Sequence, residues 1–353
     1  MVKVKGNIRV VALHPKEWSS GLYKVPGIEV KHTEIGGPIP RRMNGAVSYD
    51  GIGQVLTEEG FENLRELVTS FQPHILLFGI HIGFTAFHLK KLKARCRFIK
   101  FVMHYTDQRP SVSKFIKAHK DMIDVLLITN QDKADYDLYR KSQIVRVDTF
   151  FDGVSPIEYY PKPTKIKYDV FFGGNNFWGL NRILENRRMN HPAPWIRKFT
   201  GAKFREDFIL EVNDCFNLVI RGENGWDDFK EILNLQPMTF HPDYLSSLRE
   251  AKINLNTINV KRYGLLTRRF FRTMASGRLF LTEYCDGLES HFKNHEHLVW
   301  FNGIEEGLDL IKYYLDHDGE RERIASKGRK EILLKHTFET RLQQFEKLAR
   351  KYL

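Results

Sequence analysis

Two arginines at the start of a short predicted helix carry the clearest chemical signal in this 353-residue sequence. Arg268 and Arg269 open the segment 268–277, which reads Arg-Arg-Phe-Phe-Arg-Thr-Met-Ala-Ser-Gly. Cations at a helix N-terminus oppose the helix dipole, and this arrangement becomes favourable when an anion binds there. The segment therefore predicts a phosphate-binding site. A basic, solvent-facing turn is the alternative interpretation.

Two loops that follow predicted strands are further candidates for phosphate contact. They hold Gly173, Gly174 and Asn175 after the strand that begins at Tyr168, and Ser20 and Gly21 after the strand 8–13. Glycine lets backbone N–H groups come close to phosphate oxygens. The same glycines also suit tight turns without any ligand.

Asp107 is the candidate general base. It follows the predicted strand 97–103, so it lies at the carboxyl edge of the sheet, where catalytic groups of α/β folds gather. A carboxylate there can accept the proton of an attacking hydroxyl group. The alternatives are an ion pair with Arg109 or a cap on the helix that begins at Ser111.

Strands and helices alternate along the whole chain and would position these residues. In the first half the predicted strands are 8–13, 74–79, 97–103 and 124–129, and the helices are 57–68, 85–93 and 111–120. In the second half the strands are 168–174, 216–222, 252–256, 278–282 and 298–301, and the helices are 244–250, 268–276, 304–315, 320–335 and 337–353. The alternation predicts an α/β protein of two Rossmann-like, doubly wound domains facing a central cleft, with a boundary at the proline-rich segment 159–164.

The composition is that of an ordinary globular protein, with 42% hydrophobic and 28% charged residues. No apolar run approaches the ~20 residues that span a bilayer, so no membrane insertion is expected. Cys96, Cys215 and Cys285 form no close pairs, which favours a reducing, cytoplasmic location in a bacterium or a phage-infected host.

The net charge of +12 favours a polyanionic partner such as nucleic acid or an anionic membrane surface. The candidate contacts lie in the first domain and are Lys90, Lys91, Lys93, Arg95 and Arg109. A solvated basic face, or the binding of a phosphorylated small substrate, would also account for the charge.

The region from Arg269 to Arg341 resembles the C-terminal part of the CgeB-like (spore maturation) glycosyltransferases. The matching motifs are Arg269-Phe-Phe-Arg272, Ala275-Ser-Gly277, Leu279-Phe-Leu-Thr282, Gly287-Leu288, Glu305-Glu306 and His336-Thr337 with Arg341. In motif order the whole chain is also similar to the bacteriophage DNA β-glucosyltransferases, through Thr106-Asp-Gln-Arg-Pro110, Tyr159-Tyr-Pro161, Asp169–Gly174 and Arg269–Ser276.

These resemblances imply the GT-B fold, with an N-terminal acceptor-side domain (1–163), a C-terminal domain (164–336) that binds a nucleotide sugar, and a last helix (337–353) that crosses back to the first domain. They imply that Arg269 and Arg182 bind the donor's diphosphate and that Asp107 is the base. Arg272 stands where the family has a glutamate for the ribose hydroxyls. Arginine only donates hydrogen bonds, so the ribose is held differently or the donor carries extra negative charge.

We therefore predict an inverting glycosyltransferase that uses a nucleotide sugar, with a UDP-sugar as first choice, no tightly bound cofactor and no metal. The retaining enzymes use two glutamates at positions that hold Gly264 and Arg272 here. The first-choice acceptor is a hydroxymethylated base in DNA, as in phage DNA modification. The alternatives are a cell-surface or spore glycan or a small molecule, and a non-catalytic nucleic-acid-binding protein on the same scaffold.

Overall fold

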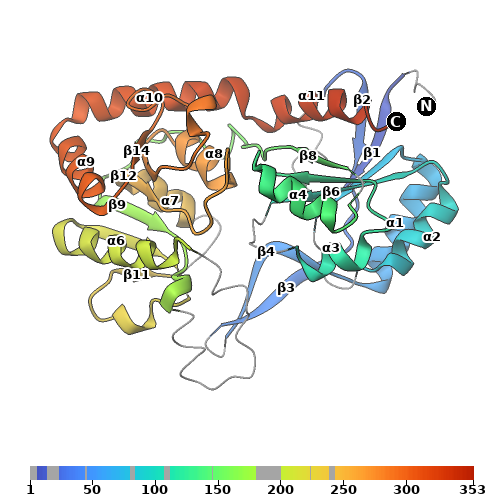
Figure 1. Cartoon of the computed structure of the whole chain (residues 1–353), viewed down its shortest axis with the longest axis horizontal. Helices are drawn as coiled ribbons and strands as arrows, with labels where there is room; N and C mark the ends of the chain where they lie inside the picture. The colour runs from blue at the N-terminus through green and yellow to red at the C-terminus, as the bar shows by residue number, and fades with distance from the viewer. Residues whose placement is uncertain are drawn as a thin grey trace. The chain divides into compact units, whose positions relative to one another are not determined.

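The computed structural model describes residues 6–13, 24–43, 46–79, 84–106, 112–144, 146–179, 200–222, 224–237 and 243–353. The chain forms two compact units, Met1–Gly153 with Thr337–Leu353, and Val154–His336. Each unit contains one six-stranded parallel sheet with helices around it, so the predicted α/β class is confirmed (Figure 1).

The first unit has the strand order β2-β1-β5-β6-β7-β8. Its strands are β1 (Ile8–Ala12), β2 (Ile28–Lys31), β5 (Ile75–Phe78), β6 (Lys100–Tyr105), β7 (Val125–Ile128) and β8 (Val147–Thr149), and its helices are α1 (Glu58–Phe71), α2 (Ala86–Arg95), α3 (Lys114–His119), α4 (Lys133–Lys141) and α11 (Phe338–Ala349). Successive strand residues face opposite sides of the sheet. Val11 accordingly packs in the core beneath α1 and α2, whereas Val10 packs against α11.

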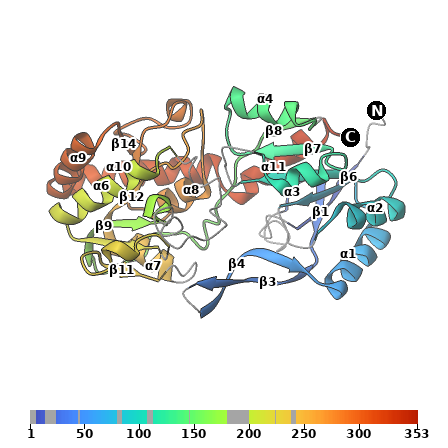
Figure 2. The same ribbon diagram turned by 60° about the horizontal axis from the view of Figure 1, so that its bottom comes forward.

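The same unit carries an antiparallel pair of strands, β3 (Gly36–Met43) and β4 (Ala46–Leu56), which the sequence analysis did not predict. Figure 2 shows the two strands side by side as a long ribbon. Its base is joined to the unit where the N–H of Thr57 donates to the carbonyl of Ile35.

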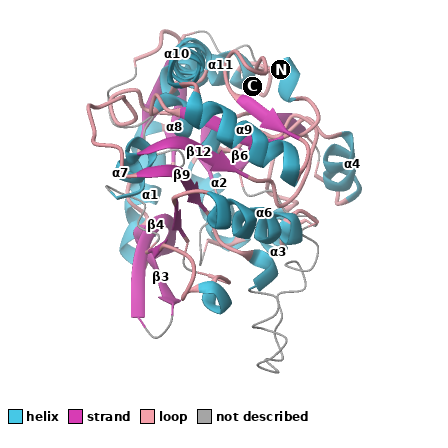
Figure 3. Cartoon of the chain, turned by 90° about the vertical axis from the view of Figure 1, so that its left-hand side faces the viewer, coloured by secondary structure: helices cyan, strands magenta, loops and turns pink. Residues whose placement is uncertain are grey.

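The second unit has the strand order β11-β10-β9-β12-β13-β14. Its strands are β9 (Tyr168–Gly173), β10 (Leu218–Arg221), β11 (Leu235–Gln236), β12 (Ala251–Asn256), β13 (Leu279–Glu283) and β14 (Val299–Phe301), and its helices are α6 (Ala202–Cys215), α7 (Asp243–Glu250), α8 (Arg268–Ala275), α9 (Ile304–Asp316) and α10 (Asp318–Lys335). Helices α6 and α9 cover one face of β9 and β12 (Figure 3), where Phe208 and Ile311 join Phe172 and Leu255 in the core.

The boundary between the units lies at Gly153, ten residues before the predicted position at 163. The segment that follows belongs to the second unit because the N–H of Val154 donates to the carbonyl of His336 and the ring of Tyr159 contacts Arg272. The chain therefore leaves the first unit and enters the second before it reaches the prolines around Pro161. The proline-rich stretch itself packs on the second unit.

Candidate functional site

The winding of the second sheet selects one place for a ligand. From β9 the chain builds outward to β10 and β11 on one side, then returns to β12 beside β9 and continues to β13 and β14 on the other. Ligands of open α/β sheets bind at such a switch point, beyond the carboxyl ends of the strands. The site is therefore expected where β9 ends at Gly173 and β12 ends at Asn256.

Arg269, predicted to bind phosphate, lies at this switch point. Its Nη1 donates to Asn256 Oδ1 at 2.9 Å, and its Cζ lies 5.8 Å from the centroid of the Phe172 ring. The amide of Asn256 is fixed in turn, because its Nδ2 donates to Thr282 Oγ1 at 2.8 Å. A half-buried guanidinium held by a neutral amide keeps its full positive charge available to an anion.

A second guanidinium, Arg205 of α6, lies beneath the same edge and was not predicted from the sequence. Its Cζ is 5.4 Å from the Phe172 ring, and the side chain is 3% exposed. Burial and the nearby Arg269 lower the pKa of Arg205 to about 9, whereas Glu283 opposes this shift. Arg205 is therefore a cation at neutral pH. The available signal was that Arg205 falls on the apolar stripe of α6, with Phe208, Ile209 and Val212.

The glycine pair leaves space beside Arg269 and Tyr244. The N–H of Gly174 donates to the carbonyl of Arg221 at 2.8 Å, so this amide is already engaged within the sheet. A Cβ on Gly174 would lie 3.3 Å from Nη2 of Arg269, and a Cβ on Gly173 would lie 2.6 Å from the ring of Tyr244. The side chain of Asn175 accepts from the N–H of Asn224 at 3.4 Å.

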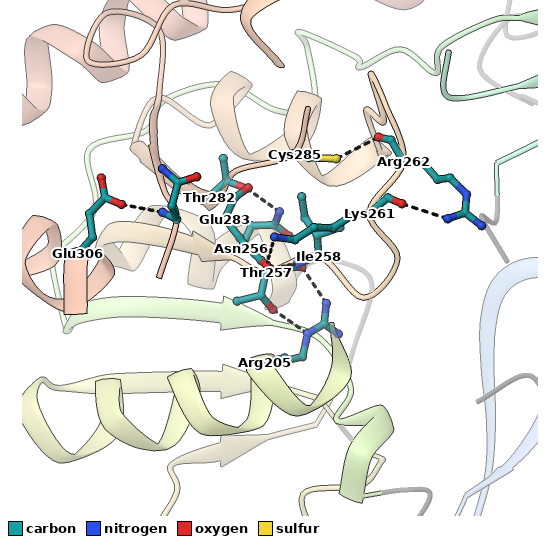
Figure 4. A network of polar contacts seen from close by, with 11 residues as sticks. Arg205, Asn256, Thr257, Ile258, Lys261, Arg262, Thr282, Glu283, Cys285 and Glu306 are labelled. Atoms are coloured by element: carbon teal, nitrogen blue, oxygen red, sulfur yellow. Dashed lines mark hydrogen bonds and ion pairs between the residues drawn. The ribbon is translucent and has the colours of Figure 1, made fainter. Parts of the chain in front are cut away.

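The loop after β12 is organised by one buried carboxylate, Glu283 (Figure 4). Its Oε2 accepts from the N–H of Ile258 at 2.8 Å, and its Oε1 pairs with Lys261 Nζ at 2.9 Å. Cys285 secures the same loop by donating to the carbonyl of Arg262 at 3.0 Å. Glu283 is 3% exposed, so its carboxylate stabilises the loop from the interior of the unit.

Arg268 and Arg272, the other two arginines of α8, are both half-buried. The guanidinium of Arg272 lies 5.3 Å from the ring centroid of Tyr159. Burial raises the pKa of Tyr159, and the positive charges of Arg272 and Arg268 oppose that rise. Arg272 therefore stacks on an aromatic ring at the position where the resembling family has a ribose-binding glutamate.

Several predicted site residues lie outside the described residues. They are Asp107, Arg109, Arg182, Ser20 and Gly21.

The basic cluster on α2 divides into two parts. Lys90 and Lys91 are exposed, and Nζ of Lys91 lies 4.4 Å from the ring centroid of the exposed Phe87. Lys93 instead turns inward and donates to the carbonyl of Ile99 at 2.5 Å, and burial lowers its pKa. Arg95 is exposed at the end of the helix, where Gln72 Nε2 donates to its carbonyl, and this end lies at the amino edge of the sheet. The cluster therefore runs away from the carboxyl edge.

The described part of the chain contains no group of three or more His, Cys, Asp or Glu side chains placed to hold a metal ion. Among its helices, none is both long and apolar enough to cross a membrane.

The comparisons with known proteins agree with this architecture. Residues 202–347 match the family model described as "Glycosyl transferase-like". No curated protein sequence matches the chain significantly. The match spans α6 to α11 and includes both Arg205 and Arg269.

Solved structures share the fold over nearly the whole chain. They include Anabaena HepE in complex with UDP (TM-score 0.55, 10% identity, 98% of this chain and 100% of that chain). A glycosyltransferase from Rickettsia africae has a TM-score of 0.53 and 10% identity, with 99% of this chain and 99% of that chain covered. Sucrose-phosphate synthase from Thermosynechococcus elongatus has a TM-score of 0.52 and 11% identity, with 98% of this chain and 99% of that chain covered. The chain thus has the GT-B fold, and its residues 202–347 match a glycosyltransferase family model, as the sequence predicts.

Proposed function

We propose that this chain transfers a sugar from a nucleoside-diphosphate donor, and that the diphosphate binds at the carboxyl ends of β9 and β12. The observation that carries the proposal is the placement of Arg269 at the switch point, half-buried and oriented by Asn256. Phosphate oxygens there would receive charge-assisted hydrogen bonds in a partly desolvated site. Arg268 at the start of α8 adds positive charge at the same end of the helix.

For the donor we favour a UDP-sugar. The Anabaena protein of the same fold was solved with UDP, and arginines can take the place of a metal cation on a diphosphate. Because Arg272 stacks on Tyr159, the ribose hydroxyls must find their acceptors elsewhere.

In the proposed reaction, Asp107 removes the proton of the acceptor hydroxyl, and the resulting oxygen forms a bond to the anomeric carbon. The bond from that carbon to the diphosphate breaks, and the leaving group takes the electron pair. Arg269 and Arg182 neutralise its charge, and the configuration inverts. The argument for Asp107 is its position two residues beyond β6.

For the acceptor we keep a hydroxymethylated base in DNA as the hypothesis. The observations that favour it are the net charge of +12 and the exposed Phe87, Lys90 and Lys91 on α2. The base would have to leave the stack to reach the edge of the sheet. A glycan or small-molecule acceptor is the second hypothesis, and a non-catalytic DNA-binding role is the third.

Radiolabelled UDP-sugars, and then other nucleoside-diphosphate sugars, should be offered with three acceptors: hydroxymethylated duplex, plain duplex and a mixture of cell-wall glycans. The DNA hypothesis predicts label on the modified duplex alone. Label on the glycans would move the acceptor to that class while the proposed reaction stands. If no donor is transferred or hydrolysed, the enzymatic proposal fails.

A further inference from the structure

Arg205 makes an unusual set of contacts for a buried cation. Its Nε donates to Thr257 Oγ1 at 2.8 Å, its Nη2 to the carbonyl of Thr257 at 2.8 Å, and its Nη1 to the carbonyl of Asn175 at 2.9 Å. All three acceptors are neutral oxygens. A buried charge is costly unless it is well compensated, so this arginine calls for a reason beyond packing.

The contacts of Arg205 join the two loops that border the switch point. Asn175 belongs to the loop after β9, and Thr257 follows β12 directly. The neighbouring Glu206 extends the connection, because its carboxylate accepts from Asn176 Nδ2 at 2.5 Å. Asn176 Oδ1 in turn accepts from the N–H groups of Trp178 and Gly179. The first turn of α6 therefore sets the spacing between the loops.

The charge of Arg205 adds to that of Arg269. Both guanidinium groups lie within 6 Å of the Phe172 ring. The carboxylate whose charge opposes the pKa shift of Arg205 is that of Glu283, and it is already engaged with Lys261 and the N–H of Ile258. The positive charges of Arg205 and Arg269 are therefore only partly compensated by negative charge from the protein. An anion bound beside Arg269 would relieve their repulsion, because a bound negative charge attracts both.

We propose that Arg205 is a positioning residue for the donor's diphosphate. It holds the loops after β9 and β12 at the spacing that leaves Arg269 facing the phosphates, and it adds a buried positive charge beneath them. With 3% exposure it acts through these loops and through its field, without touching the ligand itself. This inference rests on the proposed function of the same site.

The test compares Arg205→Met and Arg205→Lys with a matched control, Arg321→Lys. Arg321 is a buried arginine of the same unit, on α10, whose Nη1 donates to the carbonyl of Tyr314 and pairs with Asp318. Each full-length protein is titrated with UDP, GDP, ADP and dTDP by calorimetry, and with the corresponding nucleosides by ligand-observed NMR. Melting temperatures are recorded in parallel.

We expect Arg205→Met to weaken diphosphate binding about 10-fold or more, the scale of a lost interaction with a charged group, and to change nucleoside binding less than about twofold. Arg205→Lys keeps the positive charge but loses the three hydrogen bonds, so its diphosphate affinity should lie between those of the wild type and Arg205→Met. Arg321→Lys should lower the melting temperature and leave diphosphate binding unchanged.

The inference is overturned if Arg205→Met, or Arg205→Lys should the first variant not fold, binds diphosphates like the wild type and only melts earlier. It is equally overturned if diphosphate and nucleoside binding fall together. If the wild type binds none of the four diphosphates, the proposed function itself fails, and this outcome is distinct because it appears before any variant is compared.

Discussion

The carboxyl edges of the two sheets differ in charge although both sheets are parallel and six-stranded. In the second unit β9 and β12 end beside two guanidinium groups, those of Arg205 and Arg269. In the described part of the first unit, β7 ends at Ile128, and the buried Asn130 two residues further on donates through Nδ2 to the carboxylate of Asp135 at 3.0 Å. One edge is cationic, whereas an amide and a carboxylate lie beyond the end of β7.

We infer from this difference that the side chains at the switch point, and not the fold, assign the role of each unit. A diphosphate suits the cationic edge of the second unit, and a hydroxyl that must lose a proton suits a carboxylate-bearing edge. If the assignment is right, substitutions in the second unit should change donor affinity, and those in the first should change turnover or acceptor binding.

The largest effect is expected from Asp107→Asn in the first unit. Loss of the base should lower the rate of transfer by about 100-fold or more, since proton removal contributes ~10²–10⁴. Affinity for UDP, measured by calorimetry, should stay near the wild-type value. The control is Asp132→Asn, at the N-cap of α4, because asparagine caps a helix about as well as aspartate. Normal turnover in Asp107→Asn would remove this residue from the mechanism.

In the second unit, Arg269→Ala should weaken UDP binding by roughly 1.5–3 kcal/mol, the value of a hydrogen bond to a charged group. Arg278→Ala provides the contrast, because Nε of Arg278 donates to the carbonyl of Arg249 at the opposite edge of the sheet. We expect that variant to have a lower melting temperature than the wild type and an unchanged affinity for UDP. A reversed pattern would make Arg269 a structural residue.

A smaller effect should follow from Gly174→Ala, which tests the space kept for Arg269. The new methyl group would lie 3.1 Å from Cζ of Phe172 and 3.3 Å from Nη2 of Arg269, so one of these side chains must move. A cost of about 1 kcal/mol would weaken UDP binding roughly fivefold. Gly303→Ala at the end of β14 is the control, because its methyl group meets no atom within 4 Å. Equal UDP affinity in the two variants would contradict the proposed crowding.

The smallest effect concerns the acceptor and is expected only if the acceptor is DNA. The double variant Lys90→Glu with Lys91→Glu should make DNA binding less dependent on salt. Each lost phosphate contact removes ~0.9 from the steepness of log affinity against log salt, so two lost contacts remove about 1.8. Arg95→Glu with Arg97→Glu, at the amino-edge end of α2, should change the slope less. Equal effects, or no DNA binding in the wild type, would favour the glycan acceptor.

Sequence reasoning predicted the alternating α/β fold because the parallel strands are short, continuous apolar runs between amphipathic helices. It missed β3 and β4, where Pro38, Pro40 and several glycines obscure the two-residue alternation of a strand, although Asn44-Gly45 is a common hairpin-turn pair. It singled out Arg269 and passed over Arg205. A charged residue in a helix is ordinarily assigned to the solvent face, although Arg205 falls on the apolar stripe of α6, which is buried in the structure.

The central claim is that a nucleoside diphosphate binds at the carboxyl ends of β9 and β12. Hydrogen exchange of the full chain, with and without saturating UDP and with uridine as reference, tests it most directly. We predict UDP-specific protection in peptides that cover 173–179, 256–260 and 268–275, which uridine does not reproduce. If UDP binds but these three segments exchange as in the free protein, the diphosphate site lies elsewhere and the account is contradicted.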